Sequence, residues 1–140
     1  MIKLSIIHNT DKEDAIKIYK ELLKYLKAKK EFEVLDDKNI SQAEYIVVIG
    51  GDGTLLRSFK NIKNKEVKII AINSGTLGYL TEIRKDGYKK IFENILKGKV
   101  NIEERYFFTV KIGKKEYNAL NEVFLTKDNI KRNIVSSEIY

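Results

Sequence analysis

One aspartate in this sequence lies inside a glycine-rich turn, a combination suited to phosphate chemistry. The run Val47–Leu55 reads VVIGGDGTL, a short apolar strand followed by three glycines around Asp52. Such glycines let the backbone take positive φ and approach a ligand closely, and a helix opening at Leu55 would favour an anion at its N-terminus. Because phosphates repel a carboxylate, we expect Asp52 to accept a proton from a nucleophile or to reach the phosphates through a metal ion. The alternative is a tight strand-to-helix turn in which Asp52 only caps the helix.

Two familiar phosphate loops do not fit this turn. A P-loop has Gly-Lys-Ser/Thr after its glycines, whereas this loop continues through Thr54 to Leu55 without a lysine. A dinucleotide-binding fingerprint read from Gly51 and Gly53 would need a third glycine, where the chain has Leu56. The remaining pattern is Gly-Gly-Asp-Gly-Thr.

Composition excludes several other classes of function. The 140 residues contain no cysteine, so neither disulfides nor a cysteine zinc site are possible, and His8 is the one histidine. We interpret His8 as a strand-end residue near the carboxyl edge of a sheet rather than as a catalytic group. The net charge of +7 comes from lysines spread along the chain rather than gathered in a stripe, so we predict no nucleic-acid partner. No run approaches the roughly 20 apolar residues of a membrane span, and we expect a cytoplasmic protein without a membrane partner.

Hydrophobic periodicity predicts alternating strands and helices up to Gly98. The Thr10–Glu13 segment has the spacing of a capping box, and Asp86 is the predicted cap of a later helix. Strands are predicted at Lys3–His8, Phe32–Leu35, Tyr45–Ile49 and Val67–Ile72, and helices after the capping box to about Ala28, over Leu55–Phe59, and from Asp86 to Gly98.

This alternation predicts an α/β fold with a parallel, Rossmann-like sheet over residues 1–100. In such sheets ligands bind beyond the carboxyl ends of the strands. The glycine loops Gly50–Gly53 and Gly75–Gly78 both follow predicted strands. We therefore expect the two loops to lie on one rim of the sheet.

A different pattern begins after Gly98, since strands follow one another without helices. Residues 101–140 are predicted to begin a C-terminal all-β domain that is incomplete, so we expect the chain to be a truncated form of something longer. The predicted strands are Asn101–Ile112, Tyr117–Leu125 and Ile134–Tyr140, with a hairpin turn at Gly113–Lys115.

Three segments together resemble the NAD kinases. The Gly50–Thr54 motif resembles the signature of the superfamily that joins NAD kinases, diacylglycerol and sphingosine kinases and 6-phosphofructokinases. The segment Ile72–Glu82 is similar to the second loop of the NAD kinases, and Ala119–Val123 is similar to their Asn-Glu motif. The resemblance implies transfer of the terminal phosphoryl group of ATP, or of polyphosphate in some members, to the 2′-hydroxyl of the adenosine ribose of NAD, giving NADP. It also implies a divalent metal ion, usually Mg²⁺, and a homo-oligomer, a dimer or tetramer.

The same resemblance implies roles for individual residues. Asp52 would accept the proton and Gly53 would pack against substrate, within a phosphate loop made of Gly50, Gly51, Gly53 and Thr54. The resemblance further implies an NAD site that includes Arg57 near the phosphates, Tyr79 at the adenine, Asn121 and Glu122 as polar contacts, and Arg132, whose surroundings match only loosely.

Other interpretations remain open from the sequence. The protein could be another kinase of the superfamily, acting on a lipid or a sugar phosphate, or a non-catalytic nucleotide-binding fragment. Arg57 could be a solvated surface charge, and Tyr79 could be an ordinary core residue.

Overall fold

A computed structural model of the chain describes residues 1–59, 62, 66–75, 78–81, 83–85 and 87–119. Its main body is a five-stranded sheet in which every pair of neighbours is parallel, which confirms the predicted α/β fold. The strand order is β2-β1-β3-β4-β5. The strands are β1 (Ile2–His8), β2 (Phe32–Val34), β3 (Tyr45–Gly50), β4 (Lys68–Asn73) and β5 (Ile83–Arg84).

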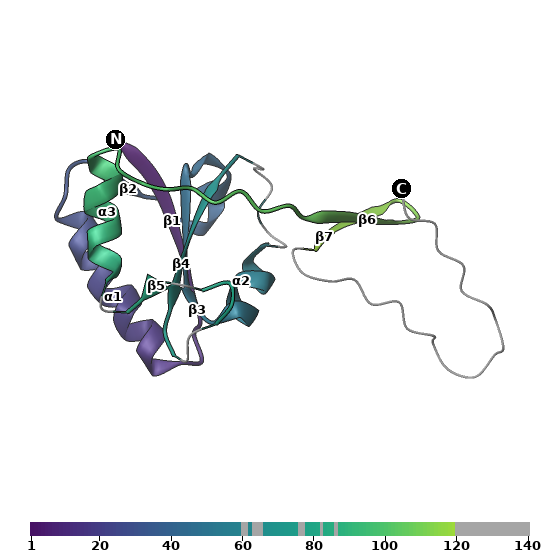
Figure 1. Cartoon of the computed structure of the whole chain (residues 1–140), viewed down its shortest axis with the longest axis horizontal. Coiled ribbons are helices and arrows are strands. Elements are labelled where there is room, and N and C mark those ends of the chain that lie inside the picture. The colour runs from purple at the N-terminus through teal and green to yellow at the C-terminus, as the bar shows by residue number, and fades with distance from the viewer. Residues whose placement is uncertain (60–61, 63–65, 76–77, 82, 86, 120–140) are drawn as a thin grey trace.

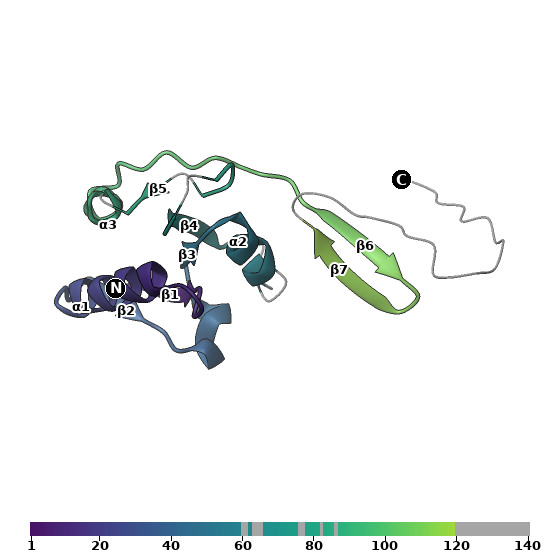
Figure 2. The same cartoon turned by 90° about the horizontal axis from the view of Figure 1, so that it is seen from below.

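Helices cover both faces of this sheet (Figure 1 and Figure 2). One face carries α1 (Glu13–Lys27) and α3 (Tyr88–Leu96). The other face carries α2 (Asp52–Phe59) and the short 3₁₀ helix η1 (Asp37–Gln42). The sheet is therefore the middle layer of three.

Strand β3 shows why its sequence is apolar at nearly every position. Val47 and Ile49 pack into the core beneath α1 and α3, whereas Ile46 and Val48 pack into the core beneath α2. Because successive side chains of a strand point to opposite faces, a strand covered on both sides needs apolar residues throughout. This burial fixes the point at which the chain leaves the sheet for α2.

The strand order also fixes where a ligand can bind. The chain passes from β1 to β2 in one direction across the sheet and from β3 to β4 in the other. The carboxyl ends of β1 and β3 lie side by side, with His8 in register with Ile49. In doubly wound sheets this change of direction creates a crevice where ligands bind. Asp52 follows β3 at this place.

After α3 the chain leaves the body and forms a β-hairpin that projects from it (Figure 1). The hairpin consists of β6 (Phe108–Ile112) and β7 (Lys115–Ala119), paired antiparallel. Gly113 has a φ of 60° in the turn, which confirms the predicted hairpin turn there. The ring of Phe107 packs edge-on against Phe59 of α2, with centroids 5.3 Å apart, so the approach to the hairpin contacts the body.

Several local predictions were wrong. The N-cap of α1 is Lys12 and makes no side-chain cap hydrogen bond, so the Thr10–Glu13 capping box does not form. Instead Glu13 and Asp14 lie in the first turn, where negative charge favours the helix dipole. Helix α2 begins at Asp52 rather than Leu55. Among the glycines, positive φ occurs at Gly98 and Gly113 and not at Gly50, Gly51 or Gly53.

Other differences concern short or irregular segments. The predicted strand Asn101–Ile112 begins only at Phe108, and both β5 and η1 were missed because two to six residues carry too little periodicity. Helix α3 has Gly87 as N-cap, while Asp86, the predicted cap, lies outside the described residues. Ile134–Tyr140 and the end of the strand predicted at Tyr117–Leu125 also lie outside them. The division into residues 1–100 and 101–140 stays a prediction.

Candidate active site

The turn from β3 into α2 is tight, and Gly50 makes it possible. A β-carbon at Gly50 would lie 2.6 Å from the β-carbon of Thr54, closer than real side chains approach. The amides of Thr54 and Leu55 donate to the carbonyl of Gly51 at 2.9 and 3.2 Å, which closes the first turn of the helix. Thr54 is itself buried. Gly50 and Thr54 therefore shape the turn by packing.

The other two glycines of the loop leave its backbone open. A β-carbon at Gly51 or at Gly53 would meet no atom within 4 Å, and Gly53 is exposed. Asp52 is thus flanked on both sides by backbone that a ligand can approach closely. The close approach that the sequence predicted is possible here without positive φ.

The carboxylate of Asp52 connects the two loops. Its Oδ2 accepts a hydrogen bond from the amide of Tyr79 at 2.8 Å. Its Oδ1 accepts from the amide of Leu80 at 3.1 Å and from both the amide and the hydroxyl of Thr81 at 3.0 Å. These bonds place the segment after β4 beside the start of α2, on the rim that the sequence predicted.

These contacts also set the charge of Asp52. Burial is the largest single influence on its pKa and raises it, but the hydrogen bonds from Tyr79, Leu80 and Thr81 together outweigh burial and hold the pKa below its ordinary value. Asp52 is also the first residue of α2, where the helix dipole favours negative charge. The carboxylate is therefore ionised at neutral pH.

Three residues that support Asp52 were not assigned a role from the sequence. Gly78 lies against the carboxylate, and a β-carbon there would come within 2.6 Å of the Asp52 Cγ. Asn73, the last residue of β4, donates from Nδ2 to the hydroxyl oxygen of Thr81 at 2.8 Å. Their position could have indicated a role, because all three lie at or just after the end of a parallel strand, where side chains meet those of the neighbouring loop.

Of the remaining predicted site residues, Arg57 and Tyr79 are exposed, and three others lie outside the described residues. Arg57 is exposed in the last turn of α2. Tyr79 is 81% exposed, which excludes the core interpretation, and the guanidinium of Arg105 lies 5.9 Å from its ring centroid. Asn121, Glu122 and Arg132 lie outside the described residues.

His8 ends β1 and stacks on Tyr19 with ring centroids 4.1 Å apart. Burial lowers the pKa of His8, and Asp37 opposes this effect.

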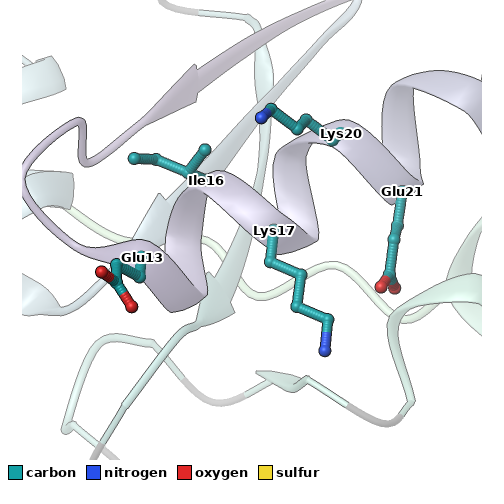
Figure 3. Close-up of a pocket in the computed structure, with 5 residues that line it drawn as sticks. All are labelled: Glu13, Ile16, Lys17, Lys20 and Glu21. Atoms are coloured by element: carbon teal, nitrogen blue, oxygen red, sulfur yellow. The ribbon is translucent and has the colours of Figure 1, made fainter.

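A hollow of about 330 Å³ elsewhere on the molecule does not compete with this site. It lies along α1, on the face of the sheet opposite α2. Figure 3 shows its side chains fanning out from the helix rather than converging on a common point. Its lining is Glu13, Ile16, Lys17, Lys20 and Glu21.

The described part of the chain offers no ready-made metal cage. Among these residues no three His, Cys, Asp or Glu side chains gather closely enough to hold an ion. Asp52 is the carboxylate between the two glycine loops, and its oxygens already accept four hydrogen bonds from described residues. In the same part of the chain, no helix is both long and apolar enough to cross a membrane.

Fold and site together define a doubly wound α/β domain with a carboxylate-bearing glycine loop at the carboxyl ends of its parallel strands. Residues 35–100 match the family described as the ATP-NAD kinase N-terminal domain. The whole chain is 94% identical to an NAD kinase of Fusobacterium nucleatum subsp. nucleatum and spans 52% of it. It is 37% identical to the bifunctional NADP phosphatase/NAD kinase of Methanocaldococcus jannaschii, with 99% of the chain aligned to 27% of that protein.

Solved structures agree with these matches. The crystal structure of yeast NADH kinase complexed with NADH has the same fold, with a TM-score of 0.71 at 15% identity over 86% of this chain and 44% of that one. An Archaeoglobus fulgidus NAD kinase in complex with ATP gives a TM-score of 0.53 at 26% identity, over 77% of this chain and 41% of that one. The chain belongs to the NAD kinase family, as its sequence motifs indicated. It spans about half the length, or less, of the relatives named here.

Proposed function

We propose that this chain supplies the aspartate-bearing domain of an enzyme that phosphorylates NAD at the 2′-hydroxyl of its adenosine ribose, with ATP as donor, to give NADP. The observation that carries the proposal is the Asp52 carboxylate. It is ionised and held by the Tyr79–Thr81 segment at the rim where both glycine loops meet. Family membership supports NAD as the acceptor and ATP as the donor.

In the proposed reaction Asp52 receives the proton of the ribose hydroxyl. The 2′-oxygen bonds to the γ-phosphorus of ATP, the bond from that phosphorus to the β,γ-bridging oxygen breaks, and ADP leaves. From the described residues, Oδ1 of Asp52 already accepts three hydrogen bonds and Oδ2 accepts one. Since a carboxylate has about four lone-pair sites, Oδ2 is the oxygen with capacity for the hydroxyl.

The low pKa of Asp52 makes it a weak base, which suits phosphoryl transfer. The transition state is loose in most analyses, with little bond formation to the nucleophile, so positioning contributes more than early proton removal. The open backbone at Gly51 and Gly53 allows substrate to approach Asp52 closely. Arg57 beside the phosphates and Tyr79 beside the adenine remain proposals for the NAD site, as do Asn121, Glu122 and Arg132.

The family resemblance implies a divalent metal ion, but the described residues alone do not form a set of ligands that could hold one. Mg²⁺ is commonly held by substrate phosphates with one or two carboxylates, and we propose that the phosphates of ATP hold most of it. We further propose that the complete protein is a homo-oligomer, a dimer or tetramer. We also propose that it is cytoplasmic, where both NAD and ATP are present.

A hybrid protein tests the proposal. In it, this chain replaces the 140 matching residues of the Fusobacterium nucleatum NAD kinase. The hybrid is offered ATP with NAD, diacylglycerol or fructose 6-phosphate, and ADP and NADP are measured. We expect phosphorylation of NAD alone. A hybrid that is folded but makes no NADP, under conditions where the unaltered Fusobacterium protein does, would overturn the proposal; phosphorylation of the lipid or the sugar would reassign the substrate.

A further inference from the structure

Two buried polar side chains lie behind Asp52 and take no direct part in the proposed reaction. Thr81 is 0% exposed and Asn73 is 3% exposed. Burying polar groups is unfavourable unless they are hydrogen-bonded. Both side chains are bonded, and their bonds lead to the Asp52 carboxylate.

The hydrogen bonds from Gly75 through Asn73 and Thr81 to Asp52 form a series, and the first bond fixes the direction of the others. The amide of Gly75 can only donate, and it donates to Oδ1 of Asn73 at 2.7 Å. The Nδ2 of Asn73 therefore faces Thr81, donating to its hydroxyl oxygen at 2.8 Å and to its carbonyl at 3.3 Å. A hydroxyl has one hydrogen, and that of Thr81 is left to donate to Oδ1 of Asp52 at 3.0 Å.

This chain of bonds makes the two oxygens of Asp52 unequal. Oδ1 is saturated by the amides of Leu80 and Thr81 and by the Thr81 hydroxyl. Among the residues that the structure describes, the amide of Tyr79 is the one donor to Oδ2. Three backbone amides already attach the loop to Asp52, so the hydroxyl is not needed for attachment. Its added effect is on the orientation and charge of the carboxylate.

We propose that Thr81, oriented by Asn73, is a positioning residue whose hydroxyl holds Oδ1 of Asp52 so that Oδ2 meets the substrate hydroxyl. This inference rests on the proposed function. It assigns Thr81 an effect on turnover and on its pH dependence, with little effect on the binding of either substrate.

Thr81→Val in the hybrid protein is the main test, because valine keeps the shape and removes the hydroxyl. Losing a hydrogen bond to a charged group should lower kcat about ten- to a hundredfold, with the KM values for NAD and ATP within about twofold. The acid limb of the kcat profile should move to higher pH, since one donor to the ionised carboxylate is gone. Thr81→Ser should restore both properties.

Ser58→Ala is the matched control. Ser58 is also a buried hydroxyl, but it donates to the Leu55 carbonyl at 2.7 Å within α2. Its loss should leave kcat and the acid limb unchanged. The proposal is overturned if Thr81→Val matches the wild type in kcat and acid limb, if Thr81→Ser is as impaired as Thr81→Val, or if Ser58→Ala moves the acid limb as far.

A titration that needs no activity separates this inference from the proposed function. The carboxyl carbon of Asp52, labelled with ¹³C, is followed by NMR against pH in the hybrid. The wild-type midpoint should lie below that of Thr81→Val, with Thr81→Ala as a second variant should valine prevent folding. Equal midpoints would overturn the inference even in an active enzyme, whereas a shifted midpoint in a protein that makes no NADP would overturn only the proposed function.

Discussion

Gly78 lies directly against the carboxylate of Asp52, and a β-carbon at Gly78 would come within 2.6 Å of the Asp52 Cγ. The φ of Gly78 is not positive, so glycine is required here for space rather than for backbone conformation. The absent side chain lets the amides of Tyr79 and Leu80 reach the carboxylate. The two loops of the site can thus pack together because Gly78 has no β-carbon.

Replacing Gly78 with alanine should therefore disrupt the site. The added methyl group would push the Tyr79–Thr81 segment away from Asp52 and break hydrogen bonds to a charged group, so kcat of the hybrid should fall at least about tenfold. Gly87→Ala is the control, because a β-carbon there would have its nearest neighbour, the carbonyl of Arg84, at 3.9 Å. Wild-type turnover in Gly78→Ala would show that the contact is not needed.

The fold was predictable from sequence where burial dictates the pattern. The apolar stripe of α1 is buried as expected because the helix covers one face of the sheet, and the apolar run of β3 is buried because that strand is covered on both faces. The start of α2 was misplaced because Asp52 and Gly53 are weak helix formers, whereas packing of Thr54 on Gly50 brings the helix forward.

The site was predictable only in part. Asp52 stood out because a carboxylate among glycines is unusual for a phosphate loop. Thr81 and Asn73 did not, because their role depends on a contact between segments far apart in the chain. Exposure of Tyr79 likewise depends on the path of its loop and not on residue type.

Stability should depend on pH through His8. Burial lowers its pKa in the folded state, although Asp37 opposes this, so the unfolded chain binds a proton more readily. Stability should therefore rise with pH from the lowered folded pKa to the unfolded value of about 6.5. His8→Phe keeps a ring against Tyr19 and should flatten this slope in urea unfolding of the 140-residue chain. An unchanged slope would exclude His8 as the titrating group.

Phe92 should be essential for the core beneath α3. Its ring is fully buried and meets the ring of Phe32 edge-on, with centroids 5.9 Å apart. Phe92→Ala should lower the free energy of unfolding by about 3–5 kcal/mol. Leu96→Ala, on the exposed side of the same helix, should cost less than about 1 kcal/mol. Equal losses in chemical denaturation would contradict this assignment of the core.

The hairpin should make the 140-residue chain self-associate. Phe108 and Ile112, on one face of β6, are 61% and 62% exposed, and exposed apolar patches favour association. Phe108→Lys with Ile112→Lys should reduce the mass seen by light scattering. Lys111→Gln, which alters the exposed ion pair with Glu116 on the other face, should not. A monodisperse wild-type monomer would contradict this prediction.

The proposed role of Asp52 as proton acceptor is tested most directly by the turnover of the Asp52→Asn hybrid in an NADP-forming assay. Asparagine keeps the size of the side chain but cannot take the proton, and a positioned proton acceptor contributes about 10²–10⁴-fold. We predict a loss of kcat in that range, with Asp11→Asn, at an exposed position before α1, unchanged. Near-normal turnover of a folded Asp52→Asn protein would contradict the account.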